Sequence, residues 1–518
     1  MNEKDLKIKK ILSLALKYHQ ENNFKDAGIL YKEILKLNPT HVDANNNLGI
    51  ILMAVGERKK AINCFQKAIE IKPDHSDSYS NLGLIFHQIK EYQKAIQYYE
   101  KAIEIEPDHL NAHFNLGLVN QELKNHKKAT HYYKKAIKIK SNHANSYSNI
   151  ASVFKELGKL KEAIKFYEKA ITYEPKNLLN YYYLSELNKK VLTSELKERV
   201  IENIKTKKSN SLNLAYGNFL LAKYAQQNKN CKEELDHLLK GHKNYFQSKL
   251  QYHNSQVQYW LNKLPNNREL FDLKNKYEKN QKIKPIFIFG TPRCGSTLIE
   301  KIIISGNENI TGGEETEIIN YFLKQNILDK KSIVSNIKDL KNKIIEKYKE
   351  KNLIKKKSNY VFTDKSLDNF FYISLIKNIF PDAKLINCKR DSLSSIISIL
   401  KNNITGLAWA HSLDNIFEYF NIYNKTMQNY KKIYPNNIYE LEIEKFTNAP
   451  EIESKKLMKF CNLPWSKKCL KFYKRRNLIS QTASNIQIRQ AIYKHSKEKY
   501  LPYKKLLEKY KDKYYWFK

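Results

Sequence analysis

Small and aromatic residues recur with a period of 34 along the first part of the chain. The small positions are Ala27, Ala61, Ala95, Ala129 and Ala163. The aromatic positions follow four residues later, at Tyr31, Phe65, Tyr99, Tyr133 and Tyr167. A spacing of four places both rows on one helix face, where small residues let paired helices approach and the aromatic ring fills the space beside them. Because one helix pair cannot bury its own apolar face, the pattern predicts an all-α solenoid over residues 1–190.

Further positions share this period. Prolines that end successive units stand at Pro39, Pro73, Pro107 and Pro175. Leu-Gly pairs mark the first helices, at Leu48-Gly49, Leu82-Gly83 and Leu116-Gly117. Together these rows resemble the tetratricopeptide repeat family, with about five repeats and a partial, capping sixth near Asn180. The resemblance implies that the repeat groove binds a peptide or protein partner.

Four asparagines also fall in the 34-residue register: Asn47, Asn81, Asn115 and Asn149. In the tetratricopeptide family such asparagines often face the concave groove and bind an extended peptide backbone. The alternative is that they only make the exposed helix face polar.

The pattern changes twice after the array. Residues 191–283 favour helix and carry no clear motif, so we expect a helical bridge with a linker near 276–284. From Pro285 onward apolar runs alternate with helical patterns, which predicts an α/β domain with a mostly parallel sheet over 284–518. The candidate strands are Ile286–Phe289, Tyr360–Thr363, Lys384–Cys388 and Ile438–Ile443.

The first of these strands leads into a loop with glycines at Gly290 and Gly295, followed by a helical pattern. A strand, a glycine-bearing loop and a helix N-terminus direct backbone N–H groups at an anion, usually a phosphate. Ser296 stands where an ATP- or GTP-binding loop needs lysine, which disfavours a kinase. Arg293 supplies a cation inside the loop.

Three later stretches carry candidate chemistry. Gly312–Ile319 contains the adjacent carboxylates Glu314 and Glu315. Lys365 follows the second candidate strand. Arg390 follows the third, with Ser398 eight residues further on a predicted helix.

These stretches resemble the sulfotransferases that use 3′-phosphoadenosine 5′-phosphosulfate (PAPS), in particular the tyrosylprotein sulfotransferase branch and bacterial sulfotransferases with tetratricopeptide repeats. The resemblance covers roughly residues 285–505 and implies a P-loop-like fold in which the loop binds the 5′-phosphosulfate. The matching loop residues are Arg293, Cys294, Gly295, Ser296, Thr297 and Leu298. Arg390 and Ser398 match the family's 3′-phosphate site, and Lys365 matches a lysine 25 residues before that arginine.

The acidic motif supplies the expected base. Matching the family's Gly-Glu-Glu-Thr signature to this sequence selects Glu315 as the base. Counting the same number of residues from Arg293 as in the tyrosylprotein branch, without a gap, selects Glu314. We predict catalytic roles for Glu315, Lys365 and Arg293, with Glu314 as the alternative base and His411 as the next candidate.

The C-terminal part resembles a motif of the bacterial group that closes over the nucleotide, and the resemblance implies contacts from Ser484 and Lys499. Two positions depart from the tyrosylprotein branch. Where that branch has a second basic residue, this chain has Asn402, with Lys401 adjacent. Where that branch has a tyrosine, this chain has Ile443.

Composition and charge bear on the kind of ligand and on the expected cellular compartment. The chain has 518 residues and a formal net charge of +39, spread along its length, which favours compositional drift together with an anionic ligand over a specific nucleic acid. The six cysteines form no framework, and the charged N-terminus lacks a signal-peptide pattern, so we expect a cytoplasmic protein with reduced thiols. Neither a membrane span nor a metal site is expected, and an oligomer is compatible with the sequence.

The sequence thus predicts a PAPS-dependent sulfotransferase whose repeat array recruits the acceptor or a partner. A protein tyrosine, a sugar hydroxyl and a small molecule all remain possible acceptors. The alternative is a tetratricopeptide adaptor whose second domain binds a nucleotide without turnover.

Overall fold

The computed structural model describes residues 3–206, 209–271, 273, 283–307, 309–354, 361–475, 487–492 and 498–517. Contacts divide the chain into two compact units. The first comprises Met1–Lys155 with Lys159–Pro175, and the second comprises Glu156–Gly158 with Lys176–Lys518. In the described ranges, no helix has the length and apolar character needed to cross a membrane.

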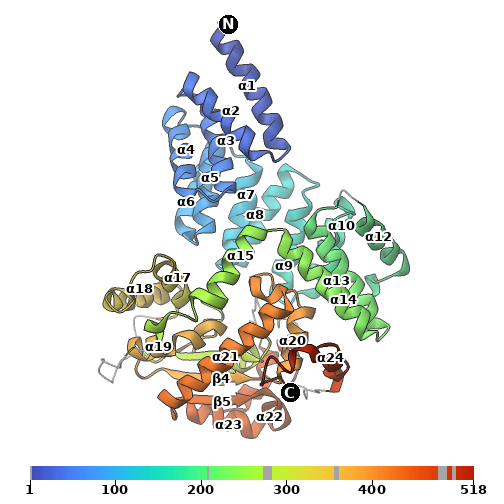
Figure 1. Ribbon diagram of the computed structural model, residues 1–518, viewed down its shortest axis with the longest axis vertical. Helices are drawn as coiled ribbons and strands as arrows, with labels where there is room; N and C mark the ends of the chain where they lie inside the picture. Colours follow the sequence, from blue (N-terminus) through green and yellow to red (C-terminus); the bar gives the residue numbers. More distant parts are fainter. Residues whose placement is uncertain are drawn as a thin grey trace. The chain divides into compact units, whose positions relative to one another are not determined.

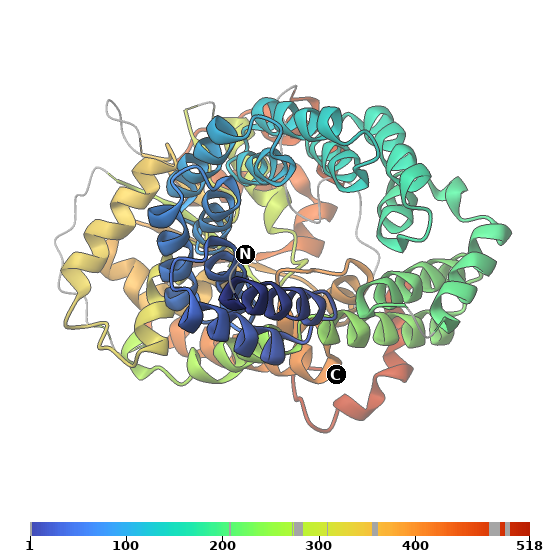
Figure 2. The ribbon, with the colours of Figure 1, turned by 90° about the horizontal axis from the view of Figure 1, so that it is seen from above.

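The first unit is all-α, as the repeat pattern predicts. Its helices are α1 (Glu3–Gln20), α2 (Phe24–Leu37), α3 (Val42–Ala54), α4 (Arg58–Ile71), α5 (Ser76–Gln88), α6 (Tyr92–Ile105), α7 (Leu110–Glu122), α8 (His126–Ile139), α9 (Ala144–Glu156) and α10 (Leu160–Tyr173). Successive helices pair and stack, and the pairs follow one another around a curve (Figure 2).

The period-34 rows form the interior of this array. All five register alanines have no exposed surface, and the aromatic rings that follow them are at most 1% exposed. A Cβ atom added at Gly117 would lie 2.4 Å from the ring of Tyr133, and one at Gly83 would lie 2.7 Å from Tyr99. The Leu-Gly pairs therefore allow the first helix of each unit to touch the aromatic ring of the second.

The second unit begins with helices on its N-terminal side. They are α11 (Leu178–Leu187), α12 (Ser194–Lys205), α13 (Ser211–Gln227), α14 (Cys231–Gln247) and α15 (Leu250–Gln258). Helices α13 and α14 pack as a close antiparallel pair, and α15 continues through a π-helical segment at Tyr259–Lys263. The predicted linker at 276–284 lies mostly outside the described residues.

A five-stranded parallel sheet forms the core of the second unit, in the order β2-β3-β1-β4-β5. The strands are β1 (Ile286–Gly290), β2 (Thr311–Gly312), β3 (Phe362–Asp364), β4 (Lys384–Lys389) and β5 (Ile438–Glu442). The four predicted strands are present, although Tyr360 lies outside the described residues. The two-residue strand β2 was not predicted, because so short a strand leaves no apolar run.

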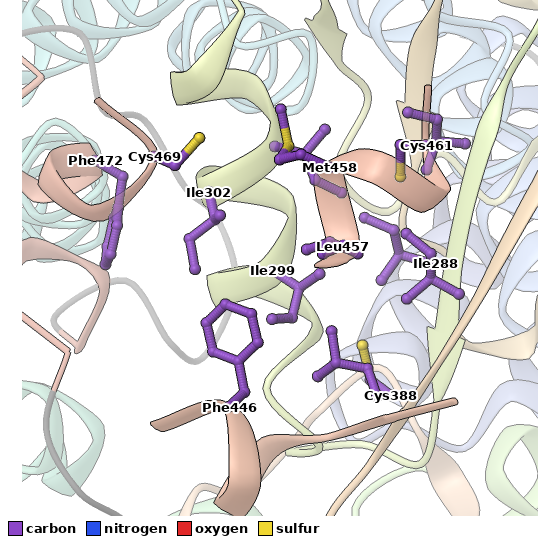
Figure 3. Packing of buried hydrophobic residues seen from close by; sticks show 14 of the residues in the cluster. Ile288, Ile299, Ile302, Cys388, Phe446, Leu457, Met458, Cys461, Cys469 and Phe472 are labelled. Atoms are coloured by element: carbon purple, nitrogen blue, oxygen red, sulfur yellow. The ribbon is translucent and has the colours of Figure 1, made fainter. Parts of the chain in front are cut away.

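Helices cover both faces of the sheet. The α-helices after β1 are α16 (Ser296–Gly306), α17 (Ile318–Leu328), α18 (Ile337–Glu350), α19 (Ile373–Ile379), α20 (Ser392–Lys401), α21 (Leu413–Ile433), α22 (Ile443–Asn448), α23 (Pro450–Phe460) and α24 (Leu501–Leu506). On one face, Ile288 and Cys388 pack against α16 and α23 (Figure 3). On the other, the Tyr423 hydroxyl of α21 donates to Asn387 at 2.6 Å, and α21 crosses the strands (Figure 1).

The strand order positions the site. Strand β1 lies between β3 and β4, so the carboxyl ends of these three strands meet at one edge of the sheet. The chain leaves β1 toward β2 on one side and leaves β4 toward β5 on the other. Ligands of open α/β sheets bind at such a switch point.

Candidate functional site

The loop after β1 has the backbone shape of an anion site. Arg293 and Gly295 adopt left-handed conformations, with φ of 69° and 92°. A Cβ atom at Gly290 would lie 2.3 Å from the carbonyl oxygen of Cys388, so only glycine lets β1 and β4 end this close together. Helix α16 then begins at Ser296, directly after Gly295, and the Cys294 thiol accepts a hydrogen bond from the backbone N–H of Ser296. The positive end of the α16 helix dipole therefore lies at this loop, and such a helix end favours an anion.

Three predicted donor-binding residues meet beside this loop. The Arg390 guanidinium donates to the carbonyl oxygen of Arg293 at 3.0 Å. The Nε of Arg293 donates to the Ser398 hydroxyl, also at 3.0 Å. Two guanidinium groups and a 6% exposed hydroxyl therefore lie at the ends of β1 and β4.

The other predicted loop residues are buried or packed against the core. Ser296 and Thr297 are buried in the first turn of α16, and Leu298 packs against the apolar cluster of Figure 3. The Cys294 thiol hydrogen-bonds with the Cys388 thiol, which lowers the pKa of Cys294 although the site is buried. Cys294 is fully enclosed and so contributes packing beneath the loop.

The predicted catalytic lysine and acid form an ion pair. Lys365 Nζ lies 2.7 Å from Glu315 Oε1. The Lys365 side chain has no exposed surface, whereas 44% of the Glu315 side chain is exposed. Burial lowers the pKa of Lys365, but the carboxylates of Glu315 and Glu300 outweigh it and raise that pKa overall. Lys365 is therefore a buried, permanent cation, and Glu315 presents a carboxylate toward solvent.

The neighbouring acid lies in a different environment. Glu314 is 6% exposed, has a left-handed φ of 56°, and accepts from Lys301 Nζ at 2.9 Å. Its backbone N–H donates to the Glu300 carboxylate at 2.9 Å. The two adjacent acids thus point apart, with Glu314 in a buried ion pair and Glu315 at the surface beside Lys365.

Two buried acids that the sequence analysis did not select hold this region in place. Glu300 of α16 has no exposed surface and accepts from the Thr363 hydroxyl at 2.7 Å as well as from Glu314. Asp364, also unexposed, accepts from the Thr316 hydroxyl at 2.6 Å. In the sequence, Glu300 could have been noticed because the charged pair Glu300-Lys301 interrupts an otherwise apolar helix pattern.

Asp364 ties both sides of the ion pair to the sheet. Its Oδ2 also accepts from the Tyr348 hydroxyl, and its Oδ1 accepts from the backbone N–H of Ser366 at 2.9 Å and from Asn369 at 3.1 Å. These partners come from α18, from the segment after β3 and from the acidic motif. Asp364 therefore fixes the backbone on either side of Lys365.

The C-terminal part adds one contact that the sequence did not indicate. The Tyr500 hydroxyl accepts from Arg390 at 3.3 Å. Burial raises the pKa of Tyr500, but the charges of Arg390 and Lys499 outweigh it and lower that pKa overall. Lys499 is exposed, with its Nζ 4.9 Å from the centroid of the Tyr500 ring. Ser484 lies outside the described residues.

His411 belongs to a separate cluster. Its Nδ1 lies 2.9 Å from Nδ1 of His242, and its ring centroid lies 4.5 Å from that of Tyr245. Burial, together with the nearby imidazoles of His242 and His253, lowers the pKa of His411 to about 2. No contact of His411 with Glu315 or Lys365 occurs among the described residues, so the structure gives it no role at the ion pair.

No group of three His, Cys, Asp or Glu side chains in the described ranges has the geometry of a metal site. Cations and hydroxyls converge at the carboxyl ends of the strands together with carboxylates, and Glu300, Glu314 and Asp364 are buried whereas Glu315 is exposed. The two guanidinium groups suit an anionic ligand with phosphate-like groups.

Two protein-family models match the chain. Residues 285–467 match the sulfotransferase family, and residues 41–108 and 108–173 match the tetratricopeptide repeat. The second unit thus contains a domain of the sulfotransferase family. This match supports sulfuryl transfer as its general class of chemistry.

An uncharacterized protein of Aquifex aeolicus (strain VF5) is 31% identical over 244 residues, which is 43% of this chain and 31% of that protein. The chain therefore matches about a third of the length of this curated relative. Among solved structures, MamA is 30% identical over 31% of this chain and 95% of its own, with a TM-score of 0.28. TTC0263, a thermophilic TPR protein of Thermus thermophilus, is 20% identical over 35% and 98%, with a TM-score of 0.32.

Proposed function

We propose that the chain transfers a sulfuryl group from PAPS to an acceptor oxygen or nitrogen, with the donor bound at the carboxyl ends of β1 and β4. The observation that carries this proposal is the joined set of Arg293, Arg390 and Ser398 beside the N-terminus of α16. An ATP-binding loop would need a lysine at the position of Ser296. The cations here come instead from the loop and from the neighbouring strand end.

PAPS carries two anionic ends, and the two halves of the site suit them. The loop amides with Ser296 and Thr297 would hold the 5′-phosphosulfate, and Arg293 would neutralise it. Arg390 and Ser398 would hold the 3′-phosphate through charge-assisted hydrogen bonds. Bound there, PAPS supplies an activated sulfuryl group attached to a phosphate.

The residues of the ion pair would act on the two reacting oxygens. Lys365 keeps its proton, so it is suited to stabilising negative charge on the departing phosphate oxygen. Glu315 is the exposed carboxylate and would accept the proton of the acceptor hydroxyl. Their separation of 2.7 Å puts the cation and the base at one place on the sheet edge. Glu314, held by Lys301, is less suited to the same task.

The class of acceptor is inferred from the family resemblance and from the repeat array. Resemblance to the tyrosylprotein sulfotransferase branch favours a protein tyrosine, and a sugar hydroxyl or a small molecule would meet Glu315 in the same way. The repeat array suits a peptide or protein, because Asn47, Asn81, Asn115 and Asn149 stay partly exposed in register. We propose that the array recruits the acceptor or its carrier.

Two measurements test this function. Titration of the full chain with 3′-phosphoadenosine 5′-phosphate and with ATP should show binding of the first and little of the second. Transfer of radiolabelled sulfate from PAPS to extracted proteins or glycans should then depend on Glu315. Equal affinity for both nucleotides would overturn the donor assignment, and tight sulfonucleotide binding without any transfer would favour the adaptor function.

A further inference from the structure

Helix α14 lies outside the residues that match the sulfotransferase family, yet two of its buried side chains reach the donor half of the site. Glu234 and His242 are eight residues apart, which places them two turns apart on one helix face. Their exposed fractions are 3% and 1%. Both contact the last turn of α20, the helix that carries Ser398.

Glu234 is the centre of a charged network. Its Oε1 lies 2.8 Å from Lys401 Nζ and accepts from Gln226 at 3.2 Å. Its Oε2 accepts a short hydrogen bond from the Tyr503 hydroxyl. Lys401 also donates to the Tyr503 oxygen at 2.9 Å, so α14, α20 and α24 meet at three mutually bonded groups.

His242 holds the residue before Lys401. The Leu400 carbonyl can only accept, so His242 donates to it through Nε2 at 2.8 Å. The Nδ1 of neutral His242 then accepts from Nδ1 of His411, at 2.9 Å. Helix α14 thus binds two consecutive residues, Leu400 and Lys401, directly after the turn that contains Ser398.

The same network reaches the other side of the proposed 3′-phosphate site. Tyr503 lies one helical turn after Tyr500, whose hydroxyl bonds to Arg390. Ser398 in turn accepts from Arg293, and Arg390 donates to Arg293. One buried carboxylate therefore supports both the serine side, through Lys401, and the arginine side, through Tyr503.

The network also has a consequence for charge. The family resemblance places a second basic residue near Asn402, and Lys401 is the adjacent cation. In the structure that cation is bound to Glu234, whereas Asn402 donates back to the carbonyl of Ser398 at 2.6 Å. Lys401 is thus paired with Glu234, and the guanidinium groups beside Ser398 are those of Arg293 and Arg390.

We propose that Glu234 is a positioning residue for the 3′-phosphate site and that α14 is part of the donor-binding architecture. This inference rests on the proposed function, because it needs a ligand with a 3′-phosphate. It implies that Glu234 and Tyr503 set the preference for PAPS over adenosine 5′-phosphosulfate, which lacks that phosphate, without touching either ligand.

The test compares the dissociation constants of the two nucleotides for the full chain and for the variants Glu234→Gln, Tyr503→Phe and the double variant. The single substitutions keep size and shape while removing a charge or a hydroxyl. We expect the dissociation constant for PAPS to rise about three- to thirtyfold. The constant for adenosine 5′-phosphosulfate should change much less, and the double variant should lose less than the product of the two single losses.

Tyr430→Phe is the matched structural control. Tyr430 is fully buried in the same unit, and its hydroxyl bonds to the carbonyl oxygens of Leu270 and Phe371 at 3.2 and 3.1 Å. It should lower the melting temperature and leave the nucleotide preference unchanged. A merely structural role for Glu234 would give the same pattern and would overturn the inference.

The outcomes separate the two proposals. If the wild-type chain binds PAPS no more tightly than adenosine 5′-phosphosulfate, the proposed donor site is wrong and the role of Glu234 falls with it. If the wild type discriminates and Glu234→Gln discriminates equally well or binds PAPS more tightly, the positioning role alone is overturned. A reduced preference in both Glu234→Gln and Tyr503→Phe, absent from Tyr430→Phe, supports it.

Discussion

The repeat array and the second unit are stabilised by contacts of very different range. In the array, each Leu-Gly pair meets an aromatic ring 16 residues later, and the same contact recurs one repeat further on. In the second unit, Arg293 bonds to Ser398 across 105 residues, and Tyr503 bonds to Glu234 across 269. A solenoid adds up nearest-neighbour contacts, whereas a parallel sheet brings distant segments to one edge. Changes in the array should therefore alter stability, and changes at the sheet edge should alter chemistry.

The largest expected effect separates the two adjacent acids. Glu315→Gln should lower turnover by about 10²–10⁴-fold, because a general base contributes that much, and should leave donor affinity nearly intact. Glu314→Gln should lower turnover modestly and mainly reduce stability, since it weakens the buried pair with Lys301. Turnover and donor binding are measured for both variants. Near-normal turnover of Glu315→Gln would remove this carboxylate from the mechanism.

The next effect concerns the donor. Arg390→Ala should weaken binding of PAPS by about 1.5–3 kcal/mol, the usual value of a hydrogen bond to a charged group. Adenosine 5′-phosphosulfate should bind almost unchanged, and calorimetric titration measures both. Arg199→Ala, which removes the same charge from an exposed position of α12, is the control. Equal losses for the two nucleotides would contradict the assignment of Arg390 to the 3′-phosphate.

Acid should weaken the second unit through its histidine pair. Burial lowers the pKa of His242 to about 4 and that of His411 to about 2, against 6.5 for an exposed imidazole. Below pH 6.5 the unfolded chain binds more protons at these histidines than the folded chain does. The free energy of unfolding therefore decreases as the pH is lowered. At pH 5 the loss is about 2 kcal/mol for each histidine.

Urea unfolding at pH 7.5 and pH 5 measures this loss. The groups around the pair are His253 and Tyr245. His411→Phe removes one titrating group and should show a smaller difference between the two pH values. An unchanged difference would show that other groups cause the acid sensitivity.

A smaller effect is expected inside the array. Gly117→Ala forces the Tyr133 ring to move, because the new Cβ atom would lie 2.4 Å from it, and should cost about 1–3 kcal/mol. Thermal unfolding measures the cost, and donor affinity should not change. Gly406→Ala, where no atom lies within 4 Å of the added Cβ, should be nearly neutral. A loss of donor binding in Gly117→Ala would break the separation between the two regions.

The smallest expected effect is on donor binding after removal of the array. A chain that lacks residues 1–175 keeps β1, β4, α14 and the ion pair, so it should bind sulfonucleotide with unchanged affinity. Transfer to the natural acceptor should fall if the array recruits it. A folded truncated protein with lost nucleotide affinity would show that the repeats belong to the donor site.

The sequence by itself determined the features that depend on local pattern. The 34-residue register predicted the helix pairs, and four apolar runs predicted four of the five described strands. The loop from Gly290 to Ser296 could also be predicted from the sequence, because a tight turn before a helix N-terminus needs glycine at particular positions. Helix pairing and a phosphate-type loop are properties of a few dozen consecutive residues, so one stretch of sequence suffices to reveal them.

Only the tertiary structure decided which groups face one another. Glu314 and Glu315 are equivalent in sequence, and a left-handed turn held by Glu300 directs one to Lys301 and leaves the other beside Lys365. Likewise, the sequence next to Glu234 does not predict a charged network, because its partners Lys401 and Tyr503 come from distant parts of the chain. Side-chain partners across a parallel sheet depend on strand order and helix packing. That order is a property of the whole folded unit, and no single segment carries it.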